Sequence, residues 1–259
     1  MKTLDKSVNQ STQVAFLLIE EMVAIGEPVE LKHLARRLDM PKPRVHRFLK
    51  TLQSIGYVLQ DPATERYRLS LKIYHLGQAL ADRTELLTEA RPQMVLLRDE
   101  TNQTVTLSTV EQGGMRMLDI VRAFSAVEIV TRPGALLDFH SSAQGKLALA
   151  FGSTANWDVV RAGPLRQWTP HTITSIAELE AQVAKVRAQG WAEAPEETLV
   201  GVNALSAPVM DASGLFVATI TIAGPMAAIP SPPRPDQITL VRTTATTISS
   251  NLGFTERST

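Results

Sequence analysis

Basic side chains concentrate in one short stretch of this 259-residue chain. Between Lys32 and Lys50 there are seven lysines and arginines, and Asp39 is the only acidic residue. An arginine can bind guanine O6 and N7 through two parallel hydrogen bonds, and a lysine can neutralise a phosphate. The cluster therefore favours contact with a polyanion such as DNA, and the competing interpretation is a solvated helix face.

Residues 41–55 have a helical periodicity that separates these charges from an apolar stripe. Pro41 and Pro43 stand in the first turn, where proline is tolerated because the N–H groups there have no intrahelical partner. A helix with one core-facing side and one basic side suits a DNA major groove. The predicted core face comprises Val45, Phe48, Leu49, Leu52 and Ile55, and the candidate DNA-binding residues are Lys42, Arg44, His46, Arg47 and Lys50.

Two further helices are predicted upstream. The first begins near Ser11 and ends before Gly26, and the second covers about residues 30–38. A short turn through Asp39 and Met40 then leads into the basic helix. This order of elements is typical of a helix-turn-helix.

A β-hairpin is predicted directly after the basic helix. Two short alternating segments, 57–60 and 66–69, flank a polar turn at 61–65. Arg66 and Arg68 fall on one face of the second strand, where they are expected to contact DNA phosphates. Helices and hairpin together predict a winged helix-turn-helix.

Residues 8–77 resemble the N-terminal domain of the IclR family of bacterial regulators. The resemblance is carried by LKHLARRLDMPKPRVHRFLKTLQSIGYV and then ERYRLSLKIYHLG. This chain has Pro43-Arg44 where the family usually has small hydroxyl residues, so a charged contact from Arg44 would replace a hydroxyl–phosphate contact. The positions that match the family pattern are Lys42, Val45, His46, Arg47, Leu49, Leu52, Gly56 and Tyr57.

The rest of the chain predicts an α+β fold with an antiparallel sheet, because its strands are joined mainly by tight turns. A helix over 71–83 would connect the two parts. The predicted boundaries are 8–70 for the DNA-binding domain, 71–84 for a helical linker and 85–254 for the second domain. Strands are expected at 104–110, 115–121, 127–131, 204–210 and 216–222, and helices at 86–101, 142–151, 176–189 and 236–252.

The second part also resembles the IclR family, whose effector-binding domain has a GAF-like fold. The motifs are FHSSAQGKLALA at 139–150, HTIT at 171–174, EETLVGVNALSAPV at 196–209 and VATITIAGP at 217–225. The resemblance implies an effector site formed by a loop and the strands that face it. Its candidate residues are His140, Ser141, Ser142, Ala143, Gln144, Asn203, Ala204, Thr219 and Thr221.

Elementary chemistry supports this site, with a competing interpretation. A loop that enters a helix near Ser142 offers backbone N–H groups and the positive end of the helix dipole to a carboxylate. Alternatively, Ser141 or Ser142 only caps that helix and His140 is structural. Glu196 and Glu197 either contact ligand or orient the turn at Gly201.

Several function classes are disfavoured. Gln144-Gly145-Lys146 resembles the end of a phosphate-binding loop, but His140 and Leu147 break that pattern. The second part has no nucleophile motif, the five histidines are scattered, and there is no cysteine, so no catalytic residue, metal site or cofactor is expected. No apolar run approaches the length of a membrane span, and the first residues lack the apolar core of a signal peptide, so a cytoplasmic protein is expected.

The charge distribution fits a DNA-binding part and a separate sensor. Residues 1–83 carry 13 Lys/Arg and 9 Asp/Glu, and residues 84–259 carry 13 and 17, although the whole chain is neutral. The sequence therefore predicts a transcription regulator that binds double-stranded operator DNA, has no membrane partner and responds to a small-molecule effector. By resemblance it forms a homodimer or dimer of dimers, and the effector is a small organic or aromatic acid from a catabolic or metabolic pathway.

Three questions stay open at this point. An enzyme tethered to DNA and a winged-helix protein-interaction module with a sensor domain are the rival functions. Arg122, Arg132 and Arg166 are equal candidates for binding an effector carboxylate. The sequence does not distinguish a repressor from an activator.

Overall fold

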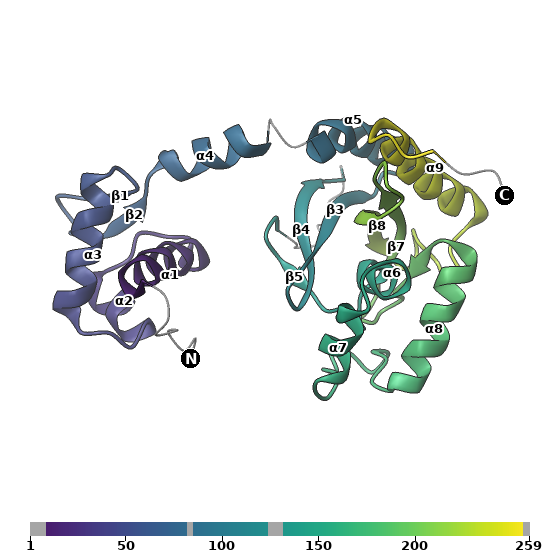
Figure 1. Ribbon diagram of the computed structural model, residues 1–259, viewed down its shortest axis with the longest axis horizontal. Coiled ribbons are helices and arrows are strands. Elements are labelled where there is room, and N and C mark those ends of the chain that lie inside the picture. The colour runs from purple at the N-terminus through teal and green to yellow at the C-terminus, as the bar shows by residue number, and fades with distance from the viewer. Residues whose placement is uncertain (1–8, 82–84, 124–131, 256–259) are drawn as a thin grey trace. The chain divides into compact units, whose positions relative to one another are not determined.

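The computed structural model describes residues 9–81, 85–123 and 132–255. The chain divides into two compact units, Met1–Arg83 and Thr84–Thr259 (Figure 1). Each unit has its own buried apolar core.

The N-terminal unit is a winged helix-turn-helix. Its elements are α1 (Gln10–Ile25), α2 (Leu31–Arg37), α3 (Lys42–Ser54), β1 (Val58–Gln60), β2 (Tyr67–Leu69) and α4 (Leu71–Ala81). Asn9 caps α1 by accepting the N–H groups of Ser11 and Thr12, and Gly26 ends it in the left-handed conformation with φ 73°. The core between the helices comprises Val14, Leu18, Met22, Leu34, Val45, Leu49 and Leu52, with Val58 and Tyr67 from the hairpin.

Two details of this unit differ from what the sequence periodicity predicts. Ile55 is 48% exposed, because α3 ends at Ser54 and the chain leaves the helix axis there. Val29, between α1 and α2, forms an antiparallel bridge with Tyr67, so a third segment joins the hairpin. The hairpin itself has the expected pairing, with Leu59 opposite Arg68.

The C-terminal unit contains a six-stranded sheet in the order β5-β4-β3-β8-β7-β6, in which all neighbouring strands are antiparallel. This confirms the α+β fold with an antiparallel sheet. The strands are β3 (Thr104–Glu111), β4 (Gly114–Val121), β5 (Leu136–Leu137), β6 (Ala192–Glu193), β7 (Val202–Met210) and β8 (Phe216–Pro225); the helices are α5 (Glu85–Thr101), α6 (Ala143–Phe151), α7 (Ala155–Arg161), α8 (Ile176–Gln189) and α9 (Pro235–Asn251).

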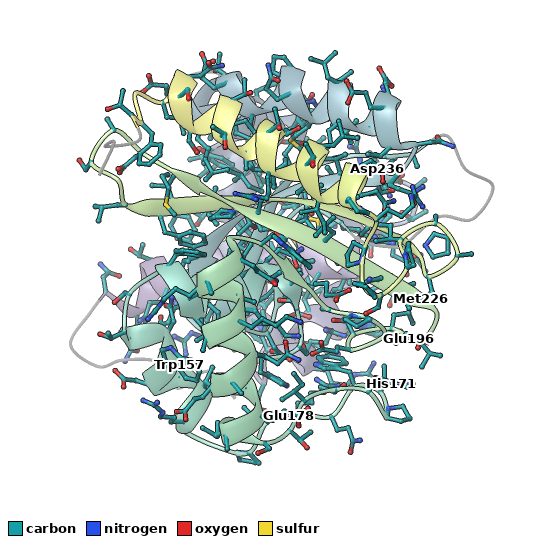
Figure 2. All side chains as sticks on the ribbon, turned by 90° about the vertical axis from the view of Figure 1, so that its right-hand side faces the viewer. Trp157, His171, Glu178, Glu196, Met226 and Asp236 are labelled. Carbon is teal, nitrogen blue, oxygen red and sulfur yellow. The ribbon has the colours of Figure 1, made fainter. Side chains whose placement is uncertain are left out.

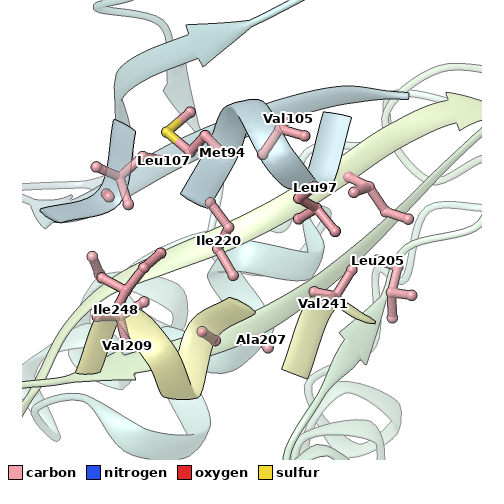
Figure 3. Packing of buried hydrophobic residues seen from close by; sticks show 14 of the residues in the cluster. Met94, Leu97, Val105, Leu107, Leu205, Ala207, Val209, Ile220, Val241 and Ile248 are labelled. Atoms are coloured by element: carbon pink, nitrogen blue, oxygen red, sulfur yellow. The ribbon is translucent and has the colours of Figure 1, made fainter. Parts of the chain in front are cut away.

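Helices cover both faces of this sheet (Figure 1). Helices α5 and α9 pack on one face, and Figure 3 shows Met94 and Leu97 of α5 and Val241 and Ile248 of α9 around strand residues such as Ile220. Helices α6 and α8 form a second apolar cluster on the other face. Because side chains alternate along a strand, each strand supplies both layers.

The strand predictions are only partly matched. The strand expected at 127–131 lies outside the described residues. After the turn at Gly134 the short edge strand β5 pairs with β4 instead, through Met115 and Arg116. Helix α7 and strand β6 were not predicted, because elements of two to seven residues show too little periodicity to be recognised.

Candidate functional site

The basic face of α3 is open to solvent while its opposite face is buried. Val45, Leu49 and Leu52 point into the core of the N-terminal unit. On the other side Lys42, His46, Arg47 and Lys50 are exposed, and Arg44 is half-buried. The hydroxyls of Thr51 and Ser54 donate to the backbone carbonyls of Arg47 and Thr51, at 3.1 and 2.8 Å. The hydroxyl protons of Thr51 and Ser54 are therefore already used, and the free donors considered for DNA are the charged side chains of this face.

The hairpin presents its two arginines as the alternation predicts. Tyr67 is buried, and Arg66 and Arg68 are exposed. The turn is held by Asp61, whose carboxylate accepts the N–H groups of Ala63 and Thr64 at 2.8 and 3.0 Å. Arg66 lies 3.6 Å from Glu30 at the start of α2. Because this ion pair is exposed, it leaves the Arg66 guanidinium accessible and contributes little to the stability of the fold.

A cavity of about 590 Å³ lies in the C-terminal unit, between the sheet and the beginning of α6. Of the predicted effector residues, Ser142, Ala143, Gln144 and Ala204 line it. Most of the other lining side chains are apolar: Met117, Ala135, Leu137, Ala194, Leu199, Val202 and Ala223, with Thr106, Arg132 and Thr198 as the remaining polar ones.

The beginning of α6 supports both interpretations of Ser142. Its hydroxyl caps the helix by accepting the Gly145 N–H at 3.1 Å and donates to the Asp138 carbonyl at 2.7 Å. Ser142 also lines the cavity, together with Ala143 and Gln144 in the first turn. The first N–H groups of a helix have no intrahelical partner, so this turn brings a positive dipole end to the cavity.

The other predicted effector residues do not line the cavity. Asn203 lies on the same face of β7 as Leu205, which packs under α9. The Asn203 amide donates to Glu193 Oε2 at 3.1 Å and to the Pro230 carbonyl at 3.2 Å. Its neighbours Val202 and Ala204 reach the cavity instead. A strand alternates its side chains, so a shift of one residue moves a side chain to the other face.

His140 and Ser141 are buried beside the cavity and have structural partners. His140 Nε2 donates to the Arg166 carbonyl at 2.9 Å and borders a separate hollow of about 190 Å³. The Ser141 carbonyl accepts the Thr198 hydroxyl at 2.8 Å. Thr219 and Thr221 are fully buried on the cavity side of β8, opposite Ser108 and Thr106 of β3.

The three candidate arginines are separated by their positions. Arg132 lines the cavity. Arg166 borders the smaller hollow, and its guanidinium stacks 3.6 Å above the Trp168 ring. Arg122 is not among the cavity-lining residues.

A loop between β6 and β7 forms one wall of the cavity. We call residues 196–201 the strap. The Thr169 and Thr172 hydroxyls donate to the Glu196 and Glu197 carbonyls, both at 2.6 Å, which gives a role to Thr172, the first threonine of the HTIT motif. Glu196 Oε1 accepts the Gly201 N–H at 2.8 Å, so this carboxylate orients the turn, and Figure 2 shows it beside His171. These bonds hold cavity residues Thr198 and Leu199 in place.

A buried ion pair joins the strap to α6. Lys146, 1% exposed, donates to Glu197, 4% exposed, and also to the Glu193 carbonyl at 3.2 Å. In the sequence, Lys146 stands out only as the end of the broken phosphate-loop pattern Gln144-Gly145-Lys146. A lysine directly before the apolar run LALA at 147–150 was the available signal, because a buried lysine requires a partner.

Stability is expected to depend on pH through this pair. Burial raises the pKa of the Glu197 carboxyl above its ordinary value of 4.5; Lys146 opposes this, and Glu178 and Glu193 add to it. The folded state then binds this proton more tightly than the unfolded state, so the free energy of unfolding falls as pH rises from 4.5 through the raised pKa.

The measurement is urea unfolding of the whole chain at several pH values, for wild type and for the Glu197→Gln variant in parallel. The stability of wild type relative to this variant should decrease as pH rises through that window. A relative stability that increases with pH would show that Lys146 dominates the titration.

Within the described parts of the chain, no three His, Asp or Glu side chains form a group that could hold a metal ion. None of the described helices is long and apolar enough to cross a membrane.

Comparison with known proteins identifies both units. The IclR helix-turn-helix domain matches residues 14–62, and the bacterial transcriptional regulator IclR C-terminal domain matches residues 78–250. The HTH-type transcriptional regulator KdgR of Dickeya chrysanthemi is 30% identical over 234 residues, covering 89% of this chain and 77% of that protein.

Solved structures agree on the fold. A transcriptional regulator from Rhodococcus sp. RHA1 superposes with a TM-score of 0.83 at 26% identity, over 95% of this chain and 98% of that one. An IclR homologue of Microbacterium hydrocarbonoxydans, complexed with 4-hydroxybenzoate, has a TM-score of 0.78 at 21% identity, over 87% and 91%. The relatives are regulators rather than enzymes. The chain belongs to the IclR family of bacterial transcriptional regulators, and it is not an enzyme.

Proposed function

We propose that this regulator binds operator DNA sequence-specifically, with α3 in the major groove and the hairpin on the phosphates. The observation that carries the proposal is the division of α3 into a buried apolar face and an exposed basic face. Base and phosphate contacts would come from Lys42, Arg44, His46, Arg47 and Lys50, and further phosphate contacts from Arg66 and Arg68.

The effector would be a small organic acid, aromatic or aliphatic, bound in the cavity of the C-terminal unit. Ser142, Ala143, Gln144 and Ala204 line this cavity, and a helix N-terminus is a ready anion site. Arg132 is the lining arginine that would attract the carboxylate. A relative of the same fold is complexed with 4-hydroxybenzoate, which fits this class of ligand. Of the other predicted residues, Thr219 and Thr221 would act from the adjoining sheet face.

The regulator would act as a homodimer or a dimer of dimers in the cytoplasm, on a catabolic or metabolic operon. Five apolar side chains on α1 and α4 are more than half exposed and would be covered by a second copy: Phe16, Val23, Leu71, Tyr74 and Leu76. Two copies would present α3 to half-sites about 34 Å apart. We place the functional boundaries at 8–70, 71–84 and 85–254.

Ligand control requires unequal affinity for two arrangements of the dimer. An effector that binds both arrangements with equal affinity does not change the equilibrium between them, however tightly it binds. The cavity would therefore differ in shape between the operator-bound and released states.

Replacing Arg47 by alanine is expected to weaken operator binding by about 1–3 kcal/mol, because its exposed guanidinium would bind a guanine edge. The matched control is Lys185→Ala, which removes one exposed positive charge from α8. Fluorescence anisotropy with duplex DNA from upstream of the gene, against a scrambled duplex, measures both variants. Equal affinities for wild type and Arg47→Ala would remove this residue from the interface.

The same assay at two salt concentrations tests the function itself. Specific binding that weakens as salt rises is expected, since neutralised phosphates release counterions. Absence of binding to any upstream duplex at low salt would contradict DNA binding and favour a protein-interaction module.

A further inference from the structure

Buried hydroxyl groups form a strip on the cavity side of the sheet. Thr106 and Ser108 of β3 stand opposite Thr221 and Thr219 of β8, and Ser206 of β7 stands opposite Thr221. All five are at most 2% exposed. A row of hydroxyls is unusual on a sheet face that a helix covers, because buried polar groups are costly unless they are hydrogen-bonded.

Only part of this strip is satisfied within the protein. Ser206 and Thr221 bond to each other at 2.8 Å, and Ser206 also donates to the Ile220 carbonyl at 3.1 Å. The hydroxyls of Thr106, Ser108 and Thr219 have no hydrogen-bond partner among the described residues. Of these three, Thr106 is the one that lines the cavity.

The polar groups available to a ligand are few. The Ser142 and Thr198 hydroxyls line the cavity but are already bonded to Asp138 and Ser141. On the sheet side, Thr106 lines the cavity and its hydroxyl lacks a partner among the described residues. On the helix side the first turn of α6 borders the cavity with Gln144, and Arg132 is the charged lining residue. The other walls are mainly apolar.

We propose that Thr106 determines effector specificity by hydrogen bonding to a second polar substituent of an acid that has a compact apolar body. Its carboxylate lies at the first turn of α6, its hydrocarbon body contacts Met117, Leu137 and Val202, and its hydroxyl or oxo group reaches Thr106. This inference rests on the proposed function and specifies its ligand class. A polyhydroxylated acid is excluded, because its further hydroxyls would be buried against apolar side chains without partners.

The probes are benzoate, the three monohydroxybenzoate isomers and gluconate, measured by isothermal titration calorimetry on the whole protein. The isomers place one hydroxyl at different positions on the same body. At least one isomer is expected to bind about tenfold more tightly than benzoate, the effect of one good hydrogen bond in a dry site. Gluconate is expected to bind more weakly than benzoate.

The test variant is Thr106→Val, which removes the hydroxyl at nearly constant shape. Affinity for the preferred isomer is expected to fall about tenfold, to that for benzoate, while benzoate affinity is unchanged. The ligand-free variant should melt at or above the wild-type temperature, because an unpartnered buried hydroxyl has been removed. Ser108→Ala is the control: it removes an equally unpartnered buried hydroxyl that does not line the cavity, and it should leave the ratio of affinities intact.

Three results would overturn the inference. One is the same hydroxybenzoate-to-benzoate ratio in Thr106→Val as in wild type. Another is a clearly lower melting temperature of ligand-free Thr106→Val, which would make the hydroxyl structural. The third is tighter binding of gluconate than of every benzoate, or no binding of any benzoate. If operator binding persists in that third case, the ligand class fails while the proposed DNA-binding function stands.

Discussion

Replacing Lys146 by methionine is expected to lower the free energy of unfolding of the C-terminal unit by about 3–5 kcal/mol. The Lys146 side chain is 1% exposed, and its ammonium group is paired with Glu197 on the strap. Without it, the Glu197 carboxylate stays buried beside Glu193 and Glu178, with one oxygen already lacking a partner among the described residues. The loss of a charge partner in a dry interior costs far more than the loss of a surface pair.

Tryptophan fluorescence during urea unfolding measures this effect in the whole chain. All three tryptophans, Trp157, Trp168 and Trp191, belong to the C-terminal unit, so their emission reports that unit alone. Lys185→Met is the matched control, since Lys185 is exposed on α8, and it should be nearly neutral.

The double variant Lys146→Met with Glu197→Met separates the charge from the packing. It should recover most of the lost stability, because a buried ion pair replaced by apolar groups of similar size is often neutral or stabilising. If the double variant is as unstable as the single one, the aliphatic stem of Lys146 and not its charge is what the fold requires.

Substituting Gly145 by alanine is expected to destabilise the same unit by about 3 kcal/mol. A Cβ at this position would overlap the Cα and carbonyl oxygen of Phe139 and lie 2.6 Å from the Asp138 carbonyl oxygen. These are backbone atoms, so no side-chain rotation relieves the overlap. Helix α6 would have to move away from residues 138–139, which also hold the Ser142 hydroxyl at the cavity.

Gly163→Ala is the control for this variant, because a Cβ there meets nothing within 4 Å. The same urea experiment compares the two. A Gly145→Ala protein as stable as Gly163→Ala would show that α6 has room to shift, and the close approach would then have no structural importance.

Much of the fold was predictable because it is encoded locally. Helix α8 runs from Ile176 to Gln189 as predicted, with Ser175 as its cap and Gly190 as its left-handed end. Helix α3 likewise has its basic and apolar faces where the periodicity placed them. In both, the signal lies in residues three or four positions apart, which a helix brings onto one face.

The composition of the cavity was less predictable, because it depends on which strand face a residue occupies. Asn203 was expected at the effector site, yet it lies on the α5–α9 side while Val202 and Ala204 line the cavity. Thr106 was not predicted at all, although it lines the cavity and its hydroxyl lacks a partner among the described residues. The sequence of a single strand does not show which of its two faces points to the cavity. Side chains alternate along a strand, so the facing side is fixed only when the strand pairs with its neighbours.

By itself the sequence determined the winged helix-turn-helix, the basic face of α3, the antiparallel α+β character of the second unit and, through its motifs, the family. Only the tertiary structure decided which residues meet at the cavity and that Lys146 pairs with Glu197, 51 positions away. The physical reason is that periodicity and capping act within a few residues. Burial of a charge or an unpaired hydroxyl is instead decided by segments that are far apart along the chain and meet only when the core closes.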